Sequence, residues 1–166
     1  LKANQSVTCV LDWPRRYNLM RAHTASHVIS AIFHQDFGAK ISGNQLSEQK
    51  IRIDFDLEEF DRDLLQSSIN KANTILQEDH KVSIEYLPRE KALQDPSLVK
   101  LAGAVPPSVA QLRIVTIGSR LRPIDRQADG GTHVKSTKEV GTLELLKAEN
   151  KGKNNRRVYV QLVDDS

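Results

Sequence analysis

The sequence has few of the features that mark secreted or membrane proteins. Its 166 residues include one cysteine, Cys9, which excludes an internal disulfide framework and suits a reducing compartment. No apolar run approaches the roughly 18 residues that a membrane-spanning helix needs. The polar start Leu-Lys-Ala-Asn-Gln does not resemble a signal peptide, and there is no internal repeat or low-complexity segment. These absences predict a cytoplasmic protein without a membrane segment.

The composition is that of a globular protein. Hydrophobic residues make up 39% of the chain and charged residues 27%, a balance typical of one domain with a real core. The net charge of +3 and the pI near 9.0 allow an anionic partner without requiring one. The chain begins with Leu1 and not with Met, which is consistent with a piece of a longer protein.

Hydrophobic periodicity predicts a small set of helices and strands. The helices are expected at residues 14–36, 61–78 and 88–93, the first of them stopping before Gly38. The strands are expected at residues 6–12, 39–48, 49–57, 82–87, 112–117, 121–124, 140–147 and 157–163. In the first strand, the apolar neighbours of Cys9 predict a buried thiol. This order predicts an α+β fold with helices packed on a mainly antiparallel β-sheet.

The first predicted helix carries a possible half of a metal site. His23 and His27 are four residues apart, so their side chains lie on the same helical face and can hold one metal ion. A zinc-protease helix needs glutamate directly after the first histidine, and Thr24 in that position argues against peptide hydrolysis. Taken alone, the pair is equally consistent with two histidines that merely share a face.

A polar segment at residues 125–138 repeats that spacing. Asp129 and His133 are also four residues apart, and three imidazoles with one carboxylate form a plausible tetrahedral set for one Zn²⁺ ion. Gly130 and Gly131 allow backbone amides to approach a ligand closely. The alternative is a tight turn capped by Asp129. No Ser-His-Asp or Cys-His set for nucleophilic catalysis is apparent.

These two motifs, His-Thr-Ala-Ser-His at residues 23–27 and Gly-Gly-Thr-His-Val at residues 130–134, resemble the editing domain of alanyl-tRNA synthetases. The similarity is greatest to the AlaX family, the free-standing relatives that edit in trans, and it extends over nearly the whole chain. The family has a cysteine where this chain has Asp129. A carboxylate is a harder ligand than a thiolate, which predicts weaker or less zinc-selective binding. Asp129 either ligates directly or leaves three histidines with an open water position.

The resemblance implies an editing domain of the alanyl/threonyl-tRNA synthetase type at residues 13–166, with residues 1–12 as the tail of an upstream domain. It implies a zinc-dependent hydrolase that deacylates mischarged tRNA(Ala), chiefly Ser-tRNA(Ala) and also Gly-tRNA(Ala). Such editing is needed because a pocket sized for alanine admits glycine and rejects an added hydroxyl only weakly. The alternatives are a non-catalytic tRNA-binding module with a structural zinc and a deacylase of another amino-acid specificity. The oligomeric state is left open.

The same resemblance assigns roles to polar residues near the motifs. Thr24 is the first candidate to contact the serine hydroxyl, and the next candidates are Thr132, Gln127, Asn44 and its neighbour Gln45. The amides of Gly130 and Gly131 are candidates to stabilise an oxyanion. The basic candidates for tRNA phosphates are Arg15, Arg16, Lys151, Lys153, Arg156 and Arg157. Local backbone hydrogen bonds for the threonines, a plain kink at residues 43–45 and a solvated basic surface are the corresponding structural alternatives.

Overall fold

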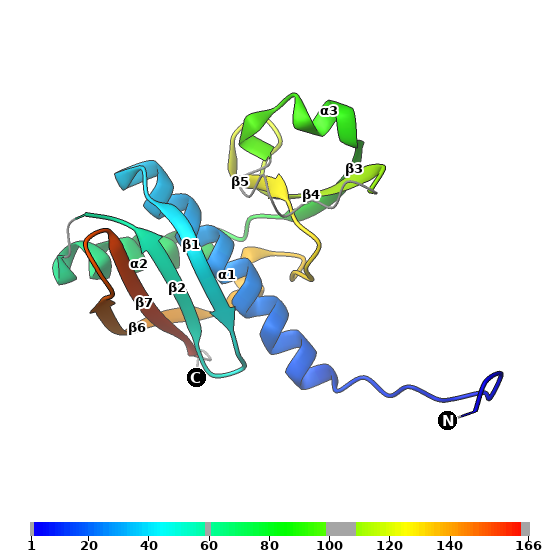
Figure 1. The fold of residues 1–166 in the computed structure, drawn as a ribbon. Helices are drawn as coiled ribbons and strands as arrows, with labels where there is room; N and C mark the ends of the chain where they lie inside the picture. Colours follow the sequence, from blue (N-terminus) through cyan, green and yellow to red (C-terminus); the bar gives the residue numbers. More distant parts are fainter. Residues whose placement is uncertain (1, 59–60, 99–108, 164–166) are drawn as a thin grey trace.

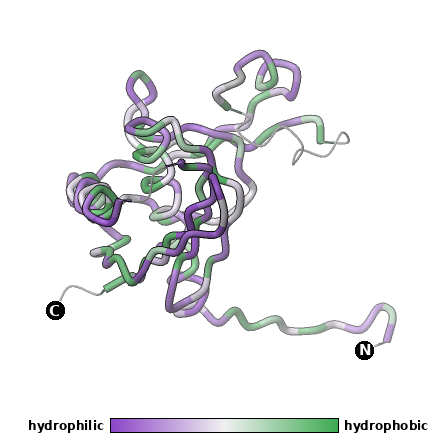
Figure 2. The backbone as a smooth tube through the Cα atoms, turned by 60° about the vertical axis from the view of Figure 1, so that its left-hand side comes forward, coloured by the Kyte–Doolittle hydropathy of each residue, from purple (hydrophilic) through white to green (hydrophobic). Residues whose placement is uncertain are grey.

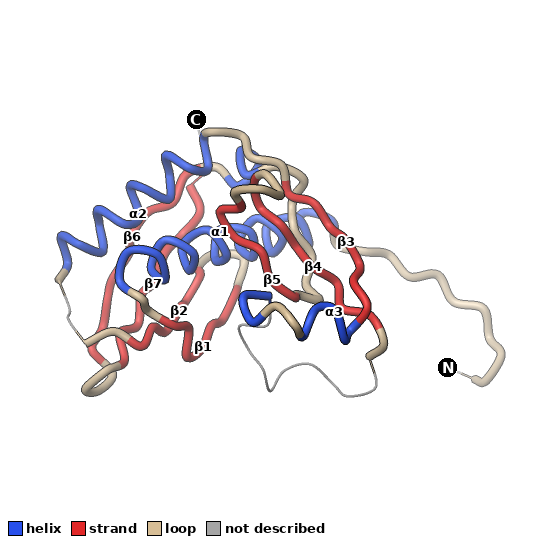
Figure 3. Tube along the Cα trace, turned by 90° about the horizontal axis from the view of Figure 1, so that it is seen from above, coloured by secondary structure: helices blue, strands red, loops and turns tan. Residues whose placement is uncertain are grey.

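One long helix, α1 (Trp13–Phe37), lies between two separate antiparallel sheets in the computed structural model (Figures 1 and 3). The structure describes residues 2–58, 61–98 and 109–163. Asp12 caps the helix by accepting a 3.1 Å hydrogen bond from the backbone N–H of Arg15, and Gly38 ends it with a φ of +67°. The predicted helix and its stop before Gly38 are confirmed. Within the described ranges, no helix is long and apolar enough to cross a membrane.

The larger sheet has four antiparallel strands in the order β1-β2-β7-β6. They are β1 (Lys40–Leu46), β2 (Ile51–Asp56), β6 (Thr142–Asn150) and β7 (Asn155–Val163). The alternation of β2 turns Ile51, Ile53 and Phe55 inward, where α1 and α2 (Arg62–Gln77) cover one face of the sheet. The predicted hairpin of β1 and β2 is confirmed, and a register shift between Ile41 and Gly43 interrupts it.

The smaller sheet has the order β3-β4-β5, from β3 (Val82–Pro88), β4 (Gln111–Gly118) and β5 (Pro123–Ala128). One face packs on α1 and brings Val115 and Ile117 into the main core. The short helices α3 (Arg89–Leu93) and η1 (Pro96–Leu98) lie with the other face, where Leu112 and Ile114 form a small second core. A 3₁₀ turn, η2 (Thr137–Val140), precedes β6. The α+β class is confirmed, with its strands divided between two sheets.

The predicted strand at residues 6–12 is wrong. These residues are extended and exposed without joining either sheet, and they project away from the rest of the chain (Figure 2). Cys9 is exposed, so its predicted burial is also wrong. A short apolar run forms a strand only where another strand or a core covers it, and the described part of the chain provides neither here.

Two other predicted boundaries differ from the structure for a common reason. The strand expected at residues 121–124 lies at Pro123–Ala128, and the hairpin tip expected at residues 149–156 is limited to residues 151–154. In both places the sequence is polar, which predicts a loop. In the structure these polar side chains belong to a strand and point inward. Asp125 on β5 and Arg156 on β7 are both buried.

The core of the larger sheet rests on a ring stack between α1 and β2. The centroids of Phe33 and Phe55 are 4.2 Å apart, and both side chains are fully buried. We expect Phe55→Ala to reduce the free energy of unfolding by about 3–5 kcal/mol, because it leaves a cavity under α1. Urea unfolding measures the change. Leu121→Ala, at a site that is 96% exposed, is the control and should stay within about 0.5 kcal/mol; a similar small change in Phe55→Ala would contradict this packing.

Candidate metal centre

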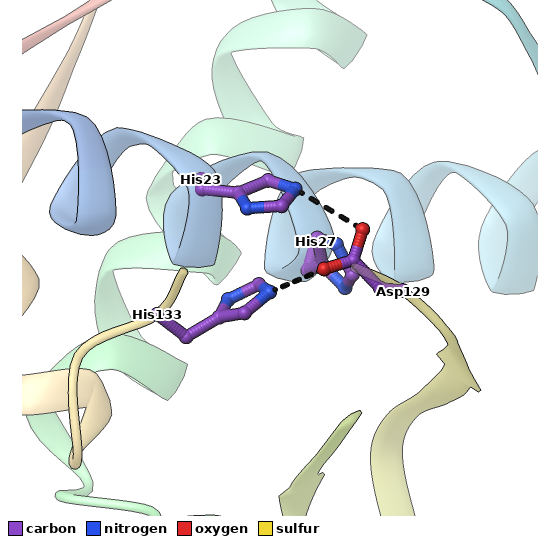
Figure 4. A group of neighbouring side chains, drawn as sticks. All are labelled: His23, His27, Asp129 and His133. Atoms are coloured by element: carbon purple, nitrogen blue, oxygen red, sulfur yellow. Dashed lines mark hydrogen bonds and ion pairs between the residues drawn. The ribbon is translucent and has the colours of Figure 1, made fainter. Parts of the chain in front are cut away.

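α1 and the loop after β5 bring four side chains together (Figure 4). His23 and His27 come from consecutive turns of the helix, and Asp129 and His133 from the loop. One ligand atom from each lies within 4.8 Å of all the others. The carboxylate of Asp129 lies 3.1 Å from Nε2 of His133 and 3.6 Å from Nε2 of His23. The four residues predicted as metal ligands are therefore brought to one point.

His27 is held from behind by β5. Its Nδ1 lies 2.8 Å from a carboxylate oxygen of Asp125, a residue that is only 3% exposed. The side-chain amide of Gln127 donates to the same oxygen at 2.9 Å and lies 2.9 Å from Nδ1 of His27. With Nδ1 engaged, His27 presents Nε2 to the cluster, and a carboxylate partner of this kind fixes a metal-binding imidazole in orientation and tautomer. Gln127 thus lies behind a ligand.

The other two histidines are fixed through the same ring nitrogen. Nδ1 of His133 lies 3.1 Å from the hydroxyl of Thr24, and Nδ1 of His23 lies 3.3 Å from the backbone carbonyl of Thr132. Thr24 is fully buried, and its hydroxyl also accepts a hydrogen bond from the backbone N–H of Val134. A contact between Thr24 and a substrate stays a prediction. In the structure the hydroxyl of Thr24 contacts His133 and fixes its ring. Thr132 is exposed beside the cluster.

Gly131 is required by the close approach of the loop to α1. A Cβ at this position would lie 2.2 Å from Cε1 of His23, so any other residue would displace the imidazole. The backbone N–H of Gly131 donates to the carboxylate of Asp129 at 2.8 Å. That amide is thus used to place a ligand, and the oxyanion contact predicted for it and for the exposed Gly130 stays untested.

Burial sets the protonation states of the cluster. It lowers the pKa of His23 to about 4, with the charges of His133 and His27 adding to the effect, and it also lowers the pKa of His133. For Asp129 burial acts to raise the pKa, but the hydrogen bond from His133 and the nearby imidazoles hold it well below its usual range. Near neutral pH, His23 and His133 are therefore neutral imidazoles and Asp129 is a carboxylate, the forms that bind a metal ion.

This donor set fits a divalent metal ion. Three imidazole nitrogens and one carboxylate oxygen are ligands that Zn²⁺ accepts, and the oxygen also admits other first-row divalent ions. His27 and His133 are buried, whereas the side chains of His23 and Asp129 are 17% and 21% exposed. A substrate would therefore approach from the side of His23 and Asp129.

Two residues near the centre were missed by sequence reasoning. Asp125 lies two residues before Gln127, which is the spacing of one strand face, but a polar strand is hard to tell from a loop. Arg113 on β4 donates to the backbone carbonyl of Asp129 at 2.8 Å and lies 3.8 Å from its carboxylate. Its position beside Asp129 depends on strand pairing, which local sequence does not indicate.

The two residues predicted on β1 point in opposite directions. Asn44 pairs with Ile53 and shares its helix-facing side of the sheet, whereas Gln45 pairs with Arg52 on the outer side. At one end of this hairpin Glu48 pairs with Arg15, and at the other Phe55 stacks on Phe33. Asn44, which is exposed, lies between these two ends and so beside the middle of α1.

The predicted basic residues fall into two groups at opposite ends of α1. Arg15 and Arg16 are on its first turn, and Arg15 forms a 3.0 Å ion pair with Glu48. The hairpin tip lies at the other end, because Arg156 pairs with Phe55, the residue stacked on Phe33. The structure therefore does not bring the two groups together.

Within the hairpin group the side chains differ in what they contact. Arg156 is buried and donates to backbone carbonyls of the turn, including Gly152 at 2.6 Å, so it has a structural part. Arg157 donates two hydrogen bonds to Asp54 at 2.7 and 2.8 Å on the outer face of the sheet. Lys151 pairs with Glu149 at 2.9 Å, and Lys153 is exposed at the tip.

Comparison with known proteins identifies first the class of domain. Residues 112–159, from β4 to β7, match the family described as the threonyl and alanyl tRNA synthetase second additional domain. This match agrees with the α+β fold and includes Asp129 and His133. The predicted editing-domain class is confirmed.

Individual relatives narrow the assignment. The chain is 48% identical over 159 residues to the alanyl-tRNA editing protein AlaX-M of Saccharolobus solfataricus, covering 96% of this chain and 65% of the relative. It is 41% identical over 165 residues to AlaX-M of Methanosarcina acetivorans, covering 99% and 66%. It is 34% identical over 142 residues to an alanine–tRNA ligase of Pyrobaculum aerophilum, covering 84% and 16%. The predicted resemblance is confirmed: the chain is a homologue of the AlaX editing proteins and spans 65–66% of their length.

The support that Asp125 gives to His27 can be tested by metal affinity. Asp125→Asn keeps the shape of the side chain but weakens the acceptor for the imidazole N–H. We expect it to raise the Kd for Zn²⁺ by about 10- to 100-fold in competition with a chromophoric chelator. Glu144→Gln, on the outer face of β6, is the matched control and should bind as the parent does. An unchanged Kd in Asp125→Asn would contradict the supporting role.

Acid should destabilise the metal-free protein through His23. Because its pKa is about 4 in the fold against 6.5 ordinarily, its contribution to stability is present above pH 6.5 and is lost as the pH falls towards 4. We expect the melting temperature of the metal-free protein to fall between about pH 7 and pH 5. It should fall less in His23→Asn, where His133 keeps its own lowered pKa. The same pH dependence in both proteins would show that His23 is not the group responsible.

Proposed function

We propose that the chain is the catalytic part of a cytoplasmic, zinc-dependent editing hydrolase that deacylates tRNA(Ala) mischarged with serine or glycine. The observation that carries the proposal is the cluster of His23, His27, Asp129 and His133, open on one side, in a homologue of proteins named alanyl-tRNA editing proteins. The bond to be broken is the ester between the amino acid and the terminal ribose, and water supplies the hydroxyl.

The chain's own residues supply a rigid and partly exposed site. Nε2 of each histidine and the carboxylate of Asp129 would hold the ion, because the Nδ1 atoms are engaged elsewhere. A bound Zn²⁺ supplies a Lewis acid for the ester carbonyl or a water of lowered pKa. Burial of His27 and His133 closes the back of the site to solvent, so the ester and its water would enter beside His23 and Asp129.

The position of Asp129 favours direct ligation over withdrawal from the ion. Its carboxylate faces Nε2 of both His23 and His133, and the amide of Gly131 holds one oxygen in place. Four protein ligands resemble a structural zinc site, yet zinc sites also expand to five ligands during catalysis. A purely structural zinc would be held by the same four residues without any release of an amino acid.

Selection of the amino acid is assigned to exposed polar groups near the cluster. Thr132 is exposed next to His133, and Asn44 faces the middle of α1 from β1. The side chain of either residue can form a hydrogen bond with a serine hydroxyl without releasing a histidine of the cluster. Thr24 and Gln127 would reach substrate only by releasing His133 and His27 respectively. A site that binds the hydroxyl in this way recognises what an alanine-sized pocket cannot reject.

Contact with the tRNA backbone is assigned to basic side chains at the surface. The proposed phosphate contacts are Arg15, Arg16, Lys151, Lys153 and Arg157. Arg156 is not among them, because it is buried and donates to the backbone of the hairpin turn. Phosphate contacts of this kind position the acceptor end and carry no base recognition. The exposed side chains of Val7, Val10 and Leu11 support the proposal that residues 1–12 pack against an upstream domain.

The activity is tested directly with purified aminoacyl-tRNAs. We expect release of serine and glycine from tRNA(Ala), little release of alanine, and loss of release after treatment with a chelator. His27→Asn should abolish both metal binding and release, while Glu144→Gln should leave them unchanged. A metal-loaded protein that binds tRNA but releases none of the three amino acids supports a structural zinc instead. Release of a different amino acid would show another specificity.

The part played by Asp129 is tested by two substitutions. Asp129→Ala should weaken zinc binding and deacylation together, because it removes a ligand. Asp129→Cys should bind Zn²⁺ more tightly than the parent and discriminate more strongly against Mn²⁺, since a thiolate is a softer donor. Metal content by mass spectrometry and competition titrations give the readout. Unchanged metal content and release in Asp129→Ala would exclude Asp129 as an essential ligand.

A further inference from the structure

Two large apolar side chains are exposed next to each other on β3. Tyr86 is 63% exposed and Ile84 is 50% exposed, and two residues apart on a strand they lie on the same face. Their partners across β4 are Arg113 and Val115. Val115 belongs to the main core. Tyr86 and Ile84 are therefore on the face of the smaller sheet that packs on α1.

The register of the strands places this exposed pair on the same face of the sheet as the candidate metal ligand Asp129 and as Gln127. Tyr86 lies opposite Arg113, and the backbone N–H of Asp129 donates to the carbonyl of Arg113 at 3.0 Å. Tyr86, Arg113 and Asp129 therefore form one row across the sheet. At about 4.8 Å per strand, Tyr86 is roughly 10 Å from the metal ligand, measured between Cα atoms.

The neighbouring row has the same arrangement. Ile84 lies opposite Val115, and Val115 lies opposite Gln127, whose amide contacts His27. Both rows run from a metal ligand or its support to an exposed apolar side chain on β3. Together they make a ledge beside the open side of the centre, with the guanidinium of Arg113 between the ligand Asp129 and the ring of Tyr86.

We propose that the ledge formed by Tyr86 and Ile84 binds the terminal adenine base of the tRNA acceptor end. The proposal rests on the proposed function, in which the ester of the terminal nucleoside lies at the metal centre. The ribose then separates the ester from the base, so the base lies one nucleoside length from the ion. An exposed aromatic ring at that distance fits a base, because nucleobases stack on tyrosine faces.

Arg113 completes the chemistry of the ledge. Its side chain is 20% exposed and lies in the row between the ring and the centre, where the ribose and its phosphate would pass. A guanidinium there favours an anionic backbone and also tolerates the adjacent carboxylate of Asp129. An apolar peptide or a second protein domain would use the ring without needing the cation or the nearby metal.

The experiment uses a hairpin RNA with the acceptor stem of tRNA(Ala), ending in 2-aminopurine in place of the terminal adenine. Serine is joined to it through a non-hydrolysable 3′-amide. Stacking on Tyr86 should quench the fluorescence as the intact protein is added. Tyr86→Ala should remove the quench and weaken binding by about 5- to 150-fold, the effect of losing one base–aromatic stack. Tyr86→Phe should retain both.

Further variants separate the ring from the fold. Tyr86→Leu keeps an apolar side chain without an aromatic face and should lose the quench as Tyr86→Ala does. Leu121→Ala, in the turn at the other end of the sheet, should behave as the parent. Deacylation of Ser-tRNA(Ala) by Tyr86→Ala should show a raised KM with kcat largely kept. Parent-like quenching, binding and KM in Tyr86→Ala would overturn the proposal.

The two levels of the proposal fail in different ways. If the parent protein hydrolyses Ser-tRNA(Ala) and Tyr86→Ala is indistinguishable from it, only the ledge is wrong. If the parent releases no amino acid from any tRNA but its quench still depends on Tyr86, the ledge is retained and the editing function is wrong.

Discussion

The contact between Asp125 and His27 ties the smaller sheet to the central helix, and the arrangement of the candidate metal ligands depends on it. A buried carboxylate is tolerated because it has hydrogen-bond partners, and here those partners are the imidazole and the amide of Gln127. The contact fixes β5 against α1, and β5 in turn starts the loop that carries Asp129 and His133. Without it, His27 would lose the partner that fixes its imidazole, and the loop would be held to the helix by fewer contacts, among them the one between Thr24 and His133.

The helix, by contrast, is fixed by apolar packing on both sides. Phe33 stacks on Phe55 of the larger sheet, and Val115 and Ile117 of the smaller sheet enter the same core. Because both sheets pack on the helix, its two histidines are held in a fixed position. Gly131 then allows the loop to come close enough for its amide to position Asp129, where any side chain would strike His23. Preorganisation of the centre follows from tight packing at these few points.

Much of this arrangement was predictable from the sequence, and the exceptions have a common cause. The α1 helix, the β1–β2 hairpin and α2 follow from local periodicity. The four clustered ligands follow from two motifs of equal spacing together with the resemblance to the editing domains. The sequence predicts loops at Asp125 and Arg156, which are buried on strands, because a polar side chain inside a strand has no local signature. At residues 6–12 the error is the reverse: a strand is predicted where the structure has none. Apolar alternation predicts a strand but does not show whether a partner strand is present. Arg113 and Tyr86 required the pairing of strands that are distant in sequence.

The ligands of the centre also come from distant parts of the chain. Asp129 follows His27 by 102 residues, and His133 follows His23 by 110. An ion that joined them would close a loop of about two-thirds of the 166-residue chain, and cross-links over long loops restrict the unfolded chain most. As the chain leaves the ribosome, the helix with its two histidines emerges long before its partners. The four candidate ligands are therefore all available only after His133 has been synthesised, and a chain that ended before Asp129 would carry only the two histidines of the helix.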